Sequence, residues 1–233
     1  MYLVTLGVGA ARSPCYRPAG LLVSHRGARV IIDGGPDTAP TGRIDAWLLT
    51  DDRAELAAAI RASARARGLV ATVAAFRAGD LCIEPKPVVH TNHPTFGYEI
   101  WCGGLKVVWA PEFFRFPKWA READLMFAEA SSWRRPIHFR GSVGGHLDAL
   151  SVQRAAQTAG VERLVLAHIG RPTIRAIAGG WRPSFGELGH DGQTFRPRLR
   201  PKLDRFRKDR VRRQQSAKRG GGIASRTGCR REA

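Results

Sequence analysis

Apolar and polar positions in the first third of the chain form short runs that end at glycines. Such runs are typical of β-strands closed by tight turns. The run Ala46–Thr50 is apolar without alternation and predicts a strand buried on both faces. In all, the pattern predicts strands over residues 2–9, 20–24, 28–35, 46–50, 70–76, 81–84, 98–102, 106–109, 124–129 and 163–167.

Two segments have helical composition. Residues 53–67 are rich in Ala, Arg, Leu and Glu and contain no Gly or Pro, which favours a helix. Residues 147–159 predict a second helix that ends before Gly160, a residue suited to the left-handed conformation just past a helix end. The chain begins with many predicted strands, and its clear helices lie between later strands. This order predicts two sheets packed face to face, with helices outside.

The composition fits a water-soluble protein with a sizeable core. The chain has 233 residues, of which 43% are hydrophobic. Its apolar runs are too short to span a membrane, and residues 1–11 lack the features of a signal peptide. The four cysteines show no Cys-x-x-Cys spacing, so we interpret them as reduced, unligated thiols. We therefore expect a cytoplasmic protein with no membrane partner.

Most of the positive charge lies at the C-terminal end. The net charge is +18, and residues 196–233 hold fifteen Lys or Arg against three acidic residues. This segment has few large apolar side chains, which predicts a disordered basic tail after a folded domain over residues 1–195. Two interpretations of the tail stay open: an arm that binds nucleic acid non-specifically through phosphates, or an extension without a selected function.

Four motifs, taken together, point to a known superfamily. They are Leu6–Gly9 with Ile31–Gly35, Val89–Tyr98, Lys106–Glu112 followed by Ala123–Glu129, and Gly145–Leu150 through Leu164–His168. Their order and spacing resemble the metallo-β-lactamase-fold hydrolases. Within them, the chain is most similar to the subgroup of transfer-RNA 3′-processing endoribonucleases and small cyclic phosphodiesterases. The resemblance implies an αββα sandwich.

The resemblance also implies roles for individual residues. His90 matches a metal ligand, although His93 competes with it for that role. Glu112 takes the place of an aspartate that bridges two metals, and His168 matches the ligand on the last strand. His146 stands where the phosphodiesterase subgroup has a histidine that protonates the leaving oxygen. Imidazole and carboxylate groups suit Zn²⁺ or Mn²⁺.

The principal metal motif of the superfamily is degenerate in this chain. After Leu48-Leu-Thr50 the family has His-x-His-x-Asp-His, and the corresponding residues are Asp51, Arg53, Glu55 and Leu56. A guanidinium and an aliphatic side chain offer no lone pair to a metal. The resemblance thus implies at most one divalent metal, or none. Its expected ligands are Asp51, His90, Glu112 and His168, with Glu55 as a further candidate.

Several of these residues also have structural interpretations. Asp52 and Glu55 have the spacing of a capping box at a helix start, and Asp148 could cap the helix that follows it. His25, His138 and His190 are interpreted as surface positions. Arginines near the expected strand ends could bind phosphate or simply be solvated: Arg12, Arg53, Arg134, Arg135, Arg140 and Arg171.

Three functions follow from these observations. The leading hypothesis is a metal-dependent hydrolase for a small phosphorylated or ester substrate, with a metal-bound hydroxide as nucleophile, His146 as general acid and Glu112 as the central ligand. The second is a non-hydrolytic binding protein. The pyrroloquinoline-quinone biosynthesis protein B family, which also has Leu-Leu-Thr-Asp at this place, offers a precedent for it. The third is nucleic-acid binding through the tail. The oligomeric state, a homodimer included, stays open.

Overall fold

The computed structural model describes residues 1–198. The contacts within the chain place Met1–Pro197 in one compact unit. The predicted basic tail, residues 196–233, lies outside the described residues except for its first three. Among the described helices, none is long and apolar enough to cross a membrane.

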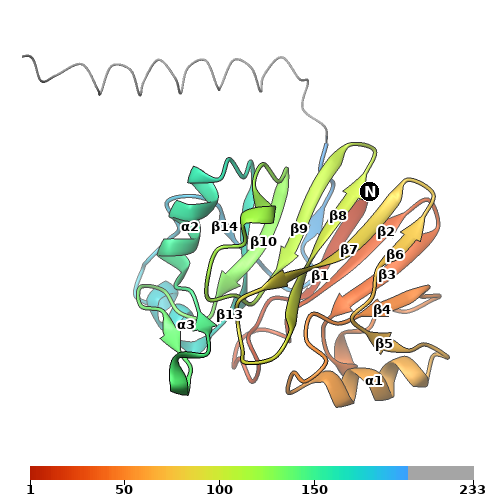
Figure 1. Ribbon diagram of the computed structural model, residues 1–233, viewed down its shortest axis with the longest axis horizontal. Coiled ribbons are helices and arrows are strands. Elements are labelled where there is room, and N and C mark those ends of the chain that lie inside the picture. Colours follow the sequence, from red (N-terminus) through yellow and green to blue (C-terminus); the bar gives the residue numbers. More distant parts are fainter. Residues whose placement is uncertain (199–233) are drawn as a thin grey trace, which may run out of the picture. The chain divides into compact units, whose positions relative to one another are not determined.

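Two large sheets pack face to face and helices cover their outer faces (Figure 1). The first sheet has the order β15-β1-β2-β3-β4-β5 and the second has the order β14-β13-β10-β9-β8-β7-β6. The strands of the first sheet are β1 (Tyr2–Gly7), β2 (Gly20–His25), β3 (Ala28–Asp33), β4 (Ala46–Leu48), β5 (Ala71–Thr72) and β15 (Thr194–Phe195). The strands of the second are β6 (Phe76–Ala78), β7 (Leu81–Val88), β8 (Thr95–Cys102), β9 (Leu105–Ala110), β10 (Leu125–Ala130), β13 (Leu164–Ile169) and β14 (Glu187–Leu188).

The remaining elements are short. A small ribbon pairs β11 (Ile137–His138) with β12 (Gly145–His146). The helices are α1 (Ala57–Arg65), which contacts β5, and α2 (Ala149–Thr158), which packs on β10 and β13, followed by α3 (Arg171–Ala178). Three short 3₁₀ turns complete the set: η1 (Pro36–Thr38), η2 (Lys118–Ala120) and η3 (Arg140–Ser142). The predicted αββα sandwich is confirmed.

The alternation along the strands explains the two parts of the core. In β2, Leu21 and Val23 face the second sheet, whereas Leu22 packs in a separate cluster with residues of α1. In β4, Trp47 belongs to the α1 cluster and Leu48 to the inter-sheet core, so this strand is buried on both faces as predicted. Each Å² of apolar surface buried in these two clusters stabilises the fold by about 25 cal/mol.

The structure corrects three details of the sequence analysis. Residues 70–76 form two strands in different sheets, β5 and β6, because the chain crosses between the sheets here. The first helix begins at Ala57 and not at residue 53, so it is shorter than predicted. Helix α3 was not predicted. Its first turn contains Arg171-Pro172, where the fixed φ of proline suits a helix start.

Two caps follow the prediction. Asp148 is the N-cap of α2 and its carboxylate accepts a hydrogen bond from the Ser151 amide at 3.0 Å. Gly160 has φ 75° directly after the C-terminal end of α2. Because Asp148 fixes the start of α2, it also fixes the path of the preceding residues, which carry His146 into the site.

Candidate metal centre

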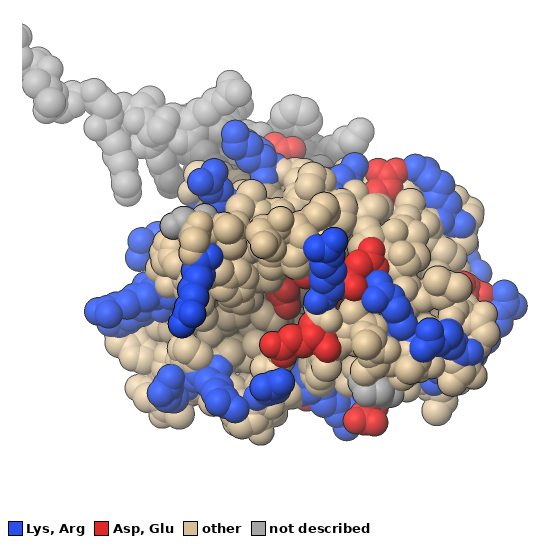
Figure 2. All heavy atoms as spheres, turned by 60° about the horizontal axis from the view of Figure 1, so that its bottom comes forward, with Lys and Arg blue, Asp and Glu red and all other residues tan. Residues whose placement is uncertain are grey.

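A cavity of about 660 Å³ opens at the ends of the strands. Its walls come from the segments that follow β1, β3, β4, β9, β10 and β13, together with the loop between β7 and β8. Figure 2 shows a face on which acidic side chains gather near the centre, with Lys and Arg side chains around them. Strand ends that meet at one edge collect side chains from distant parts of the sequence, and this edge holds the predicted site residues.

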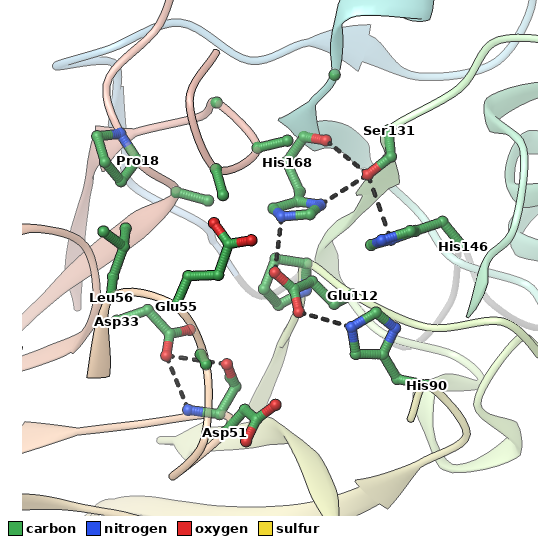
Figure 3. Close-up of a pocket in the computed structure, with 18 of the residues that line it drawn as sticks. Pro18, Asp33, Asp51, Glu55, Leu56, His90, Glu112, Ser131, His146 and His168 are labelled. Atoms are coloured by element: carbon green, nitrogen blue, oxygen red, sulfur yellow. Dashed lines mark hydrogen bonds and ion pairs between the residues drawn. The ribbon is translucent and has the colours of Figure 1, made fainter. Parts of the chain in front are cut away.

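Three of the four predicted ligands lie together in this cavity (Figure 3). The Glu112 carboxylate lies between two imidazoles, with Oε2 2.9 Å from His90 Nε2 and Oε1 2.6 Å from His168 Nε2. Glu112 follows β9, His90 follows β7, and His168 belongs to β13. The convergence therefore depends on the pairing of strands in the second sheet.

The second ring nitrogen of each histidine also has a partner. His90 Nδ1 donates to the Gly145 carbonyl at 2.9 Å, so its Nε2 carries either a second proton or a free lone pair. His168 Nδ1 lies 2.8 Å from Ser131 Oγ and 3.5 Å from Glu129 Oε1. Metal-binding histidines typically have such a partner, which fixes the orientation of the ring.

The electrostatics of this group favour an ionised Glu112 and protonated forms of His90 and His168. Burial opposes ionisation of Glu112, but His168 and His90 outweigh it and hold the pKa of that carboxyl well below its usual range. Burial likewise opposes the charged form of His168, yet Glu112 and Glu129 raise the pKa of His168 to about 10. The pKa of His90 is also raised, because Glu112 outweighs the effect of burial. Glu112 thus attracts positive charge to this point of the cavity.

His168 also has an unusual backbone conformation. Its φ is 55°, in the left-handed region that residues other than glycine rarely adopt. Asp33 has φ 54° and also lines the cavity. Strained conformations of this kind persist where the surrounding structure holds them, and they cluster at functional sites.

His146 is positioned by a fully buried carboxylate. His146 Nδ1 donates to Glu129 Oε2 at 2.7 Å. The Glu129 oxygens also accept from the backbone amides of Phe113, at 3.3 Å, and Ser131, at 2.7 Å. Burial opposes ionisation of Glu129, but His146 and His168 outweigh it and lower the pKa of Glu129 to about 2. Among the described residues, none binds His146 Nε2, which leaves this nitrogen free for a ligand in the cavity.

Asp51, the fourth predicted ligand, lies at another wall of the same cavity. Both of its oxygens are 3.0 Å from His93 Nε2, and Oδ1 accepts from the Arg53 amide at 2.7 Å. His93 lies in the loop between β7 and β8 and is bound to Asp51. Figure 3 shows Asp51 apart from the group formed by Glu112 and its two histidines. Ligation by Asp51 stays a prediction, and it would require Asp51 to leave His93.

The other positions of the degenerate motif do not form the predicted capping box. The N-cap of α1 is Leu56, without a side-chain hydrogen bond. Asp52 is exposed and its Oδ1 is 2.7 Å from Arg61 Nη2, so it pairs with the helix surface. The capping prediction is wrong because the chain makes an extra turn before the helix starts. Glu55 is exposed, and its carboxylate extends into the cavity (Figure 3).

Of the six arginines considered as phosphate-binding candidates, Arg12, Arg53 and Arg171 line the cavity. Arg134, Arg135 and Arg140 do not line it, and Arg134 stacks on the Trp181 ring at 3.7 Å. Among the described residues, the cavity therefore combines an acidic and imidazole-rich wall with guanidinium groups that can bind an anion.

Comparisons with solved structures agree with the fold. No protein-family model and no curated protein matches the sequence. The metallo-β-lactamase fold protein YhfI from Bacillus subtilis superposes with a TM-score of 0.63 and 15% identity, over 84% of this chain and 99% of that one. This chain has a metallo-β-lactamase fold.

Other structures with this fold superpose equally well. Human tRNase Z, short form, has a TM-score of 0.65 and 16% identity, over 85% of this chain and 100% of that one. Zn²⁺-bound PqqB from Methylobacterium extorquens has a TM-score of 0.61 and 16% identity, over 84% of this chain and 100% of that one. At these identities the likeness shows the metallo-β-lactamase fold, and the chemistry has to be argued from the residues.

The donor set fits a divalent metal. His90 and His168 direct Nε2 atoms at one carboxylate, and both rings are held by other groups. Among the described residues, the group in this cavity whose ligand atoms all lie within 4.8 Å of one another is Glu129, His146 and His168. Glu129 is less suited to ligation, because it is fully buried and both of its oxygens accept from backbone amides. We therefore assign His90, Glu112 and His168 as the residues that could hold a metal.

Two residues of this site, Glu129 and Ser131, were not predicted as site residues from the sequence. A lone carboxylate inside the apolar strand β10 was an available signal, because a buried charge requires hydrogen-bonding partners. Ser131 had no comparable signal: its role depends on the approach of His168, which lies 37 residues further along the chain.

Proposed function

We propose that this chain is a metal-dependent hydrolase that cleaves a phosphodiester or a related ester with one divalent metal. The observation that carries the proposal is the convergence of His90 Nε2 and His168 Nε2 on Glu112, each ring held through its other nitrogen. Three protein ligands and an open position are the arrangement typical of catalytic zinc. A divalent metal bound there would lower the pKa of a water ligand and provide a nucleophile near neutral pH.

His146 is the general acid in this proposal. Glu129 holds its Nδ1 and so orients the ring, which leaves Nε2 to face the leaving oxygen of the substrate. The side chain is largely buried, with 13% of its surface exposed, and it lines the cavity close to His168. Glu129 acts through His146 and is a positioning residue.

The substrate class follows from the charge of the cavity. Arg12, Arg53 and Arg171 provide guanidinium groups for an anionic substrate, and guanidinium binds phosphate oxygens in a bidentate manner. The name of human tRNase Z, short form, indicates a nuclease, which supports a phosphodiester as the first substrate to test. Zinc and manganese are the metals that this donor set suits.

The proposal is tested by metal content and activity together. The full chain is loaded with zinc or manganese, and bound metal is measured by mass spectrometry beside the double variant His90→Ala/His168→Ala. The control is His138→Ala/His190→Ala, because both of these histidines are exposed. We expect the first variant to lose about one equivalent of metal and the hydrolysis of a chromogenic phosphodiester. The proposal is wrong if the two variants hold the same amount of metal.

A non-hydrolytic role is the second candidate, and one observation favours it. The Asp51 carboxylate is bound by His93 and by the Arg53 amide, and Arg53 stands where the family has a ligand. Such a site retains a shaped, charged cavity with fewer metal ligands. Bound metal without hydrolysis of phosphodiesters or carboxylic esters would favour a protein that binds an anionic metabolite. Nucleic-acid binding by the tail concerns residues that the structure does not describe.

A further inference from the structure

A second cluster of metal-ligating side chains lies outside the cavity. His25 Nε2 is 2.8 Å from Asp80 Oδ1, and Cys102 Sγ is 3.8 Å from Asp80 Oδ2. The nitrogen, oxygen and sulfur atoms all lie within 4.8 Å of one another. The sequence analysis placed His25 on the surface and Cys102 among unligated thiols, but only 12% of the His25 side chain is exposed and Cys102 is 4% exposed.

Three tight turns bring these residues together. His25 pairs with Ala28 across the turn between β2 and β3, and Cys102 pairs with Leu105 across the turn between β8 and β9. Asp80 lies in the two-residue turn between β6 and β7. These turns contain residues with positive φ: Arg26, Gly27, Gly79, Gly103 and Gly104. The positions are therefore set by backbone geometry that only a few residue types adopt readily.

The cluster connects the two sheets at the end opposite to the cavity. His25 belongs to the first sheet, and Cys102 and the turn that carries Asp80 belong to the second. Strand β9 starts at Leu105, beside Cys102, and ends at Ala110, two residues before Glu112. At about 3.3 Å per residue, the strand separates the two places by roughly 17 Å. Figure 1 shows these hairpin turns at the end of the sheets away from α1.

We propose that His25, Asp80 and Cys102 form a zinc site that links the two sheets. Thiolate, imidazole and carboxylate are the ligands that zinc takes in proteins, and thiolate selects against magnesium and calcium. With bonds of about 2.0–2.3 Å, the ligand atoms of a tetrahedral site lie roughly 3.3–3.8 Å apart. The observed separations from Asp80 are 2.8 Å to His25 Nε2 and 3.8 Å to Cys102 Sγ, and all three ligand atoms lie within 4.8 Å of one another, so side-chain movements of about 1 Å suffice to bind the ion.

The remaining coordination position is open to solvent. The Asp80 side chain is 37% exposed, which leaves room for a water as the fourth ligand. Arg26 Nη1 lies 3.3 Å from Asp80 Oδ1 and competes with a cation for this carboxylate. Its side chain is 77% exposed, so it can move into solvent when the metal binds. Binding releases the Cys102 proton to solvent and forms one sulfur–metal bond, without any oxidation.

Cobalt(II) distinguishes this site from the one in the cavity. The residues assigned to the cavity metal supply only nitrogen and oxygen, whereas the second site supplies sulfur, so only the second gives a thiolate-to-cobalt charge-transfer band in the near ultraviolet. The metal-free full chain is titrated with cobalt(II), and then zinc is added to displace it. We expect a band that saturates at about one equivalent and disappears when zinc replaces cobalt.

Variants assign the band to Cys102. We expect Cys102→Ser to abolish it and His25→Asn to weaken cobalt binding at least about tenfold, which is about 1.4 kcal/mol. The controls Cys15→Ser, Cys82→Ser and Cys229→Ser should retain it. His90→Ala/His168→Ala should retain it too, so this proposal and the proposed hydrolase can fail separately. The absence of a band in the wild type, or its persistence in Cys102→Ser, would overturn the inference.

Thermal unfolding provides a second readout that does not depend on colour. Zinc that binds the folded chain and not the unfolded chain raises Tm by mass action. In the His90→Ala/His168→Ala background the second site alone remains, and zinc should still raise Tm there. Adding Cys102→Ser or His25→Asn to that background should remove the increase, while adding Cys82→Ser should not. A zinc effect that is equal in all of these variants would contradict a site at this cluster.

Discussion

The Glu112 carboxylate lies between His90 Nε2 and His168 Nε2, at 2.9 and 2.6 Å, and joins the ends of three strands in one group that is largely shielded from solvent. The negative carboxylate of Glu112 pairs with the two imidazoles in the metal-free chain. In the proposed function the same atoms bind a divalent cation. The stability of the metal-free protein and its affinity for metal therefore depend on the same residue.

Glu112→Gln tests this double dependence. An amide cannot balance the charge of the two imidazoles, and removing one partner of a fully buried ion pair costs about 3–5 kcal/mol. The Glu112 side chain is 28% exposed, so solvent screening reduces this cost. We expect the free energy of unfolding of the metal-free protein to fall by less than that amount, but by more than for an exposed pair, with loss of the cavity metal. Denaturant unfolding checks the first part and mass spectrometry the second.

The control for Glu112→Gln is Glu187→Gln. Glu187 pairs with Arg163 Nη2 at 2.6 Å, but both side chains are exposed. Surface pairs contribute about 0–1 kcal/mol, so this change should have little effect. Equal losses of stability in the two variants would contradict the interpretation of Glu112 as the centre of a stabilising ion-pair network.

His146→Ala separates catalysis from metal binding. If His146 protonates the leaving group, its removal should lower the rate of phosphodiester hydrolysis by about 10²- to 10⁴-fold. Metal content should not change, since His90, Glu112 and His168 remain. His138→Ala is the matched control: His138 lies on the partner strand of the same ribbon and is exposed. An equal loss of rate in both variants would indicate damage to the ribbon and not the loss of an acid.

The lowered pKa of Glu129 predicts that the stability of the protein depends on pH. Its pKa in the folded protein is lowered to about 2 from the usual 4.5, because His146 and His168 outweigh the effect of burial. A lowered pKa of an acid contributes stability that is present above pH 4.5 and is lost as the pH falls towards 2. Glu129→Gln removes this contribution. The difference in unfolding free energy between the wild type and this variant should therefore shrink over that window, and a constant difference would contradict the prediction.

Gly144 lies against the backbone of His90, so a side chain at this position should disturb the site. A Cβ atom at Gly144 would lie 1.9 Å from the His90 carbonyl oxygen, so Gly144→Ala must move the backbone that carries His90. We expect lower stability and weaker binding of the cavity metal. Gly68→Ala is the control, since Gly68 has φ +71° and no atom within 4 Å of the added Cβ. It should cost only about 1–2 kcal/mol of backbone strain, without an effect on the metal.

The sequence alone was sufficient to place most of the strands along the chain and to identify several residues at their ends. The continuous apolar run in β4 predicted that both of its faces are buried, because such a pattern reflects the local geometry of a strand. The motifs that surround His90, Glu112, His146 and His168 follow strands or precede a helix, so their places in the fold could be predicted.

Tertiary structure decided which side chains meet. Spacing could not show that Asp51 binds His93, that Glu129 holds His146, or that His25 approaches Cys102. These contacts join residues 17 to 77 positions apart, and they depend on how two sheets stack and how loops close over their ends. Local sequence determines the conformation of each segment, whereas the partner of a buried charge is determined by whichever polar group the packing brings within hydrogen-bonding distance.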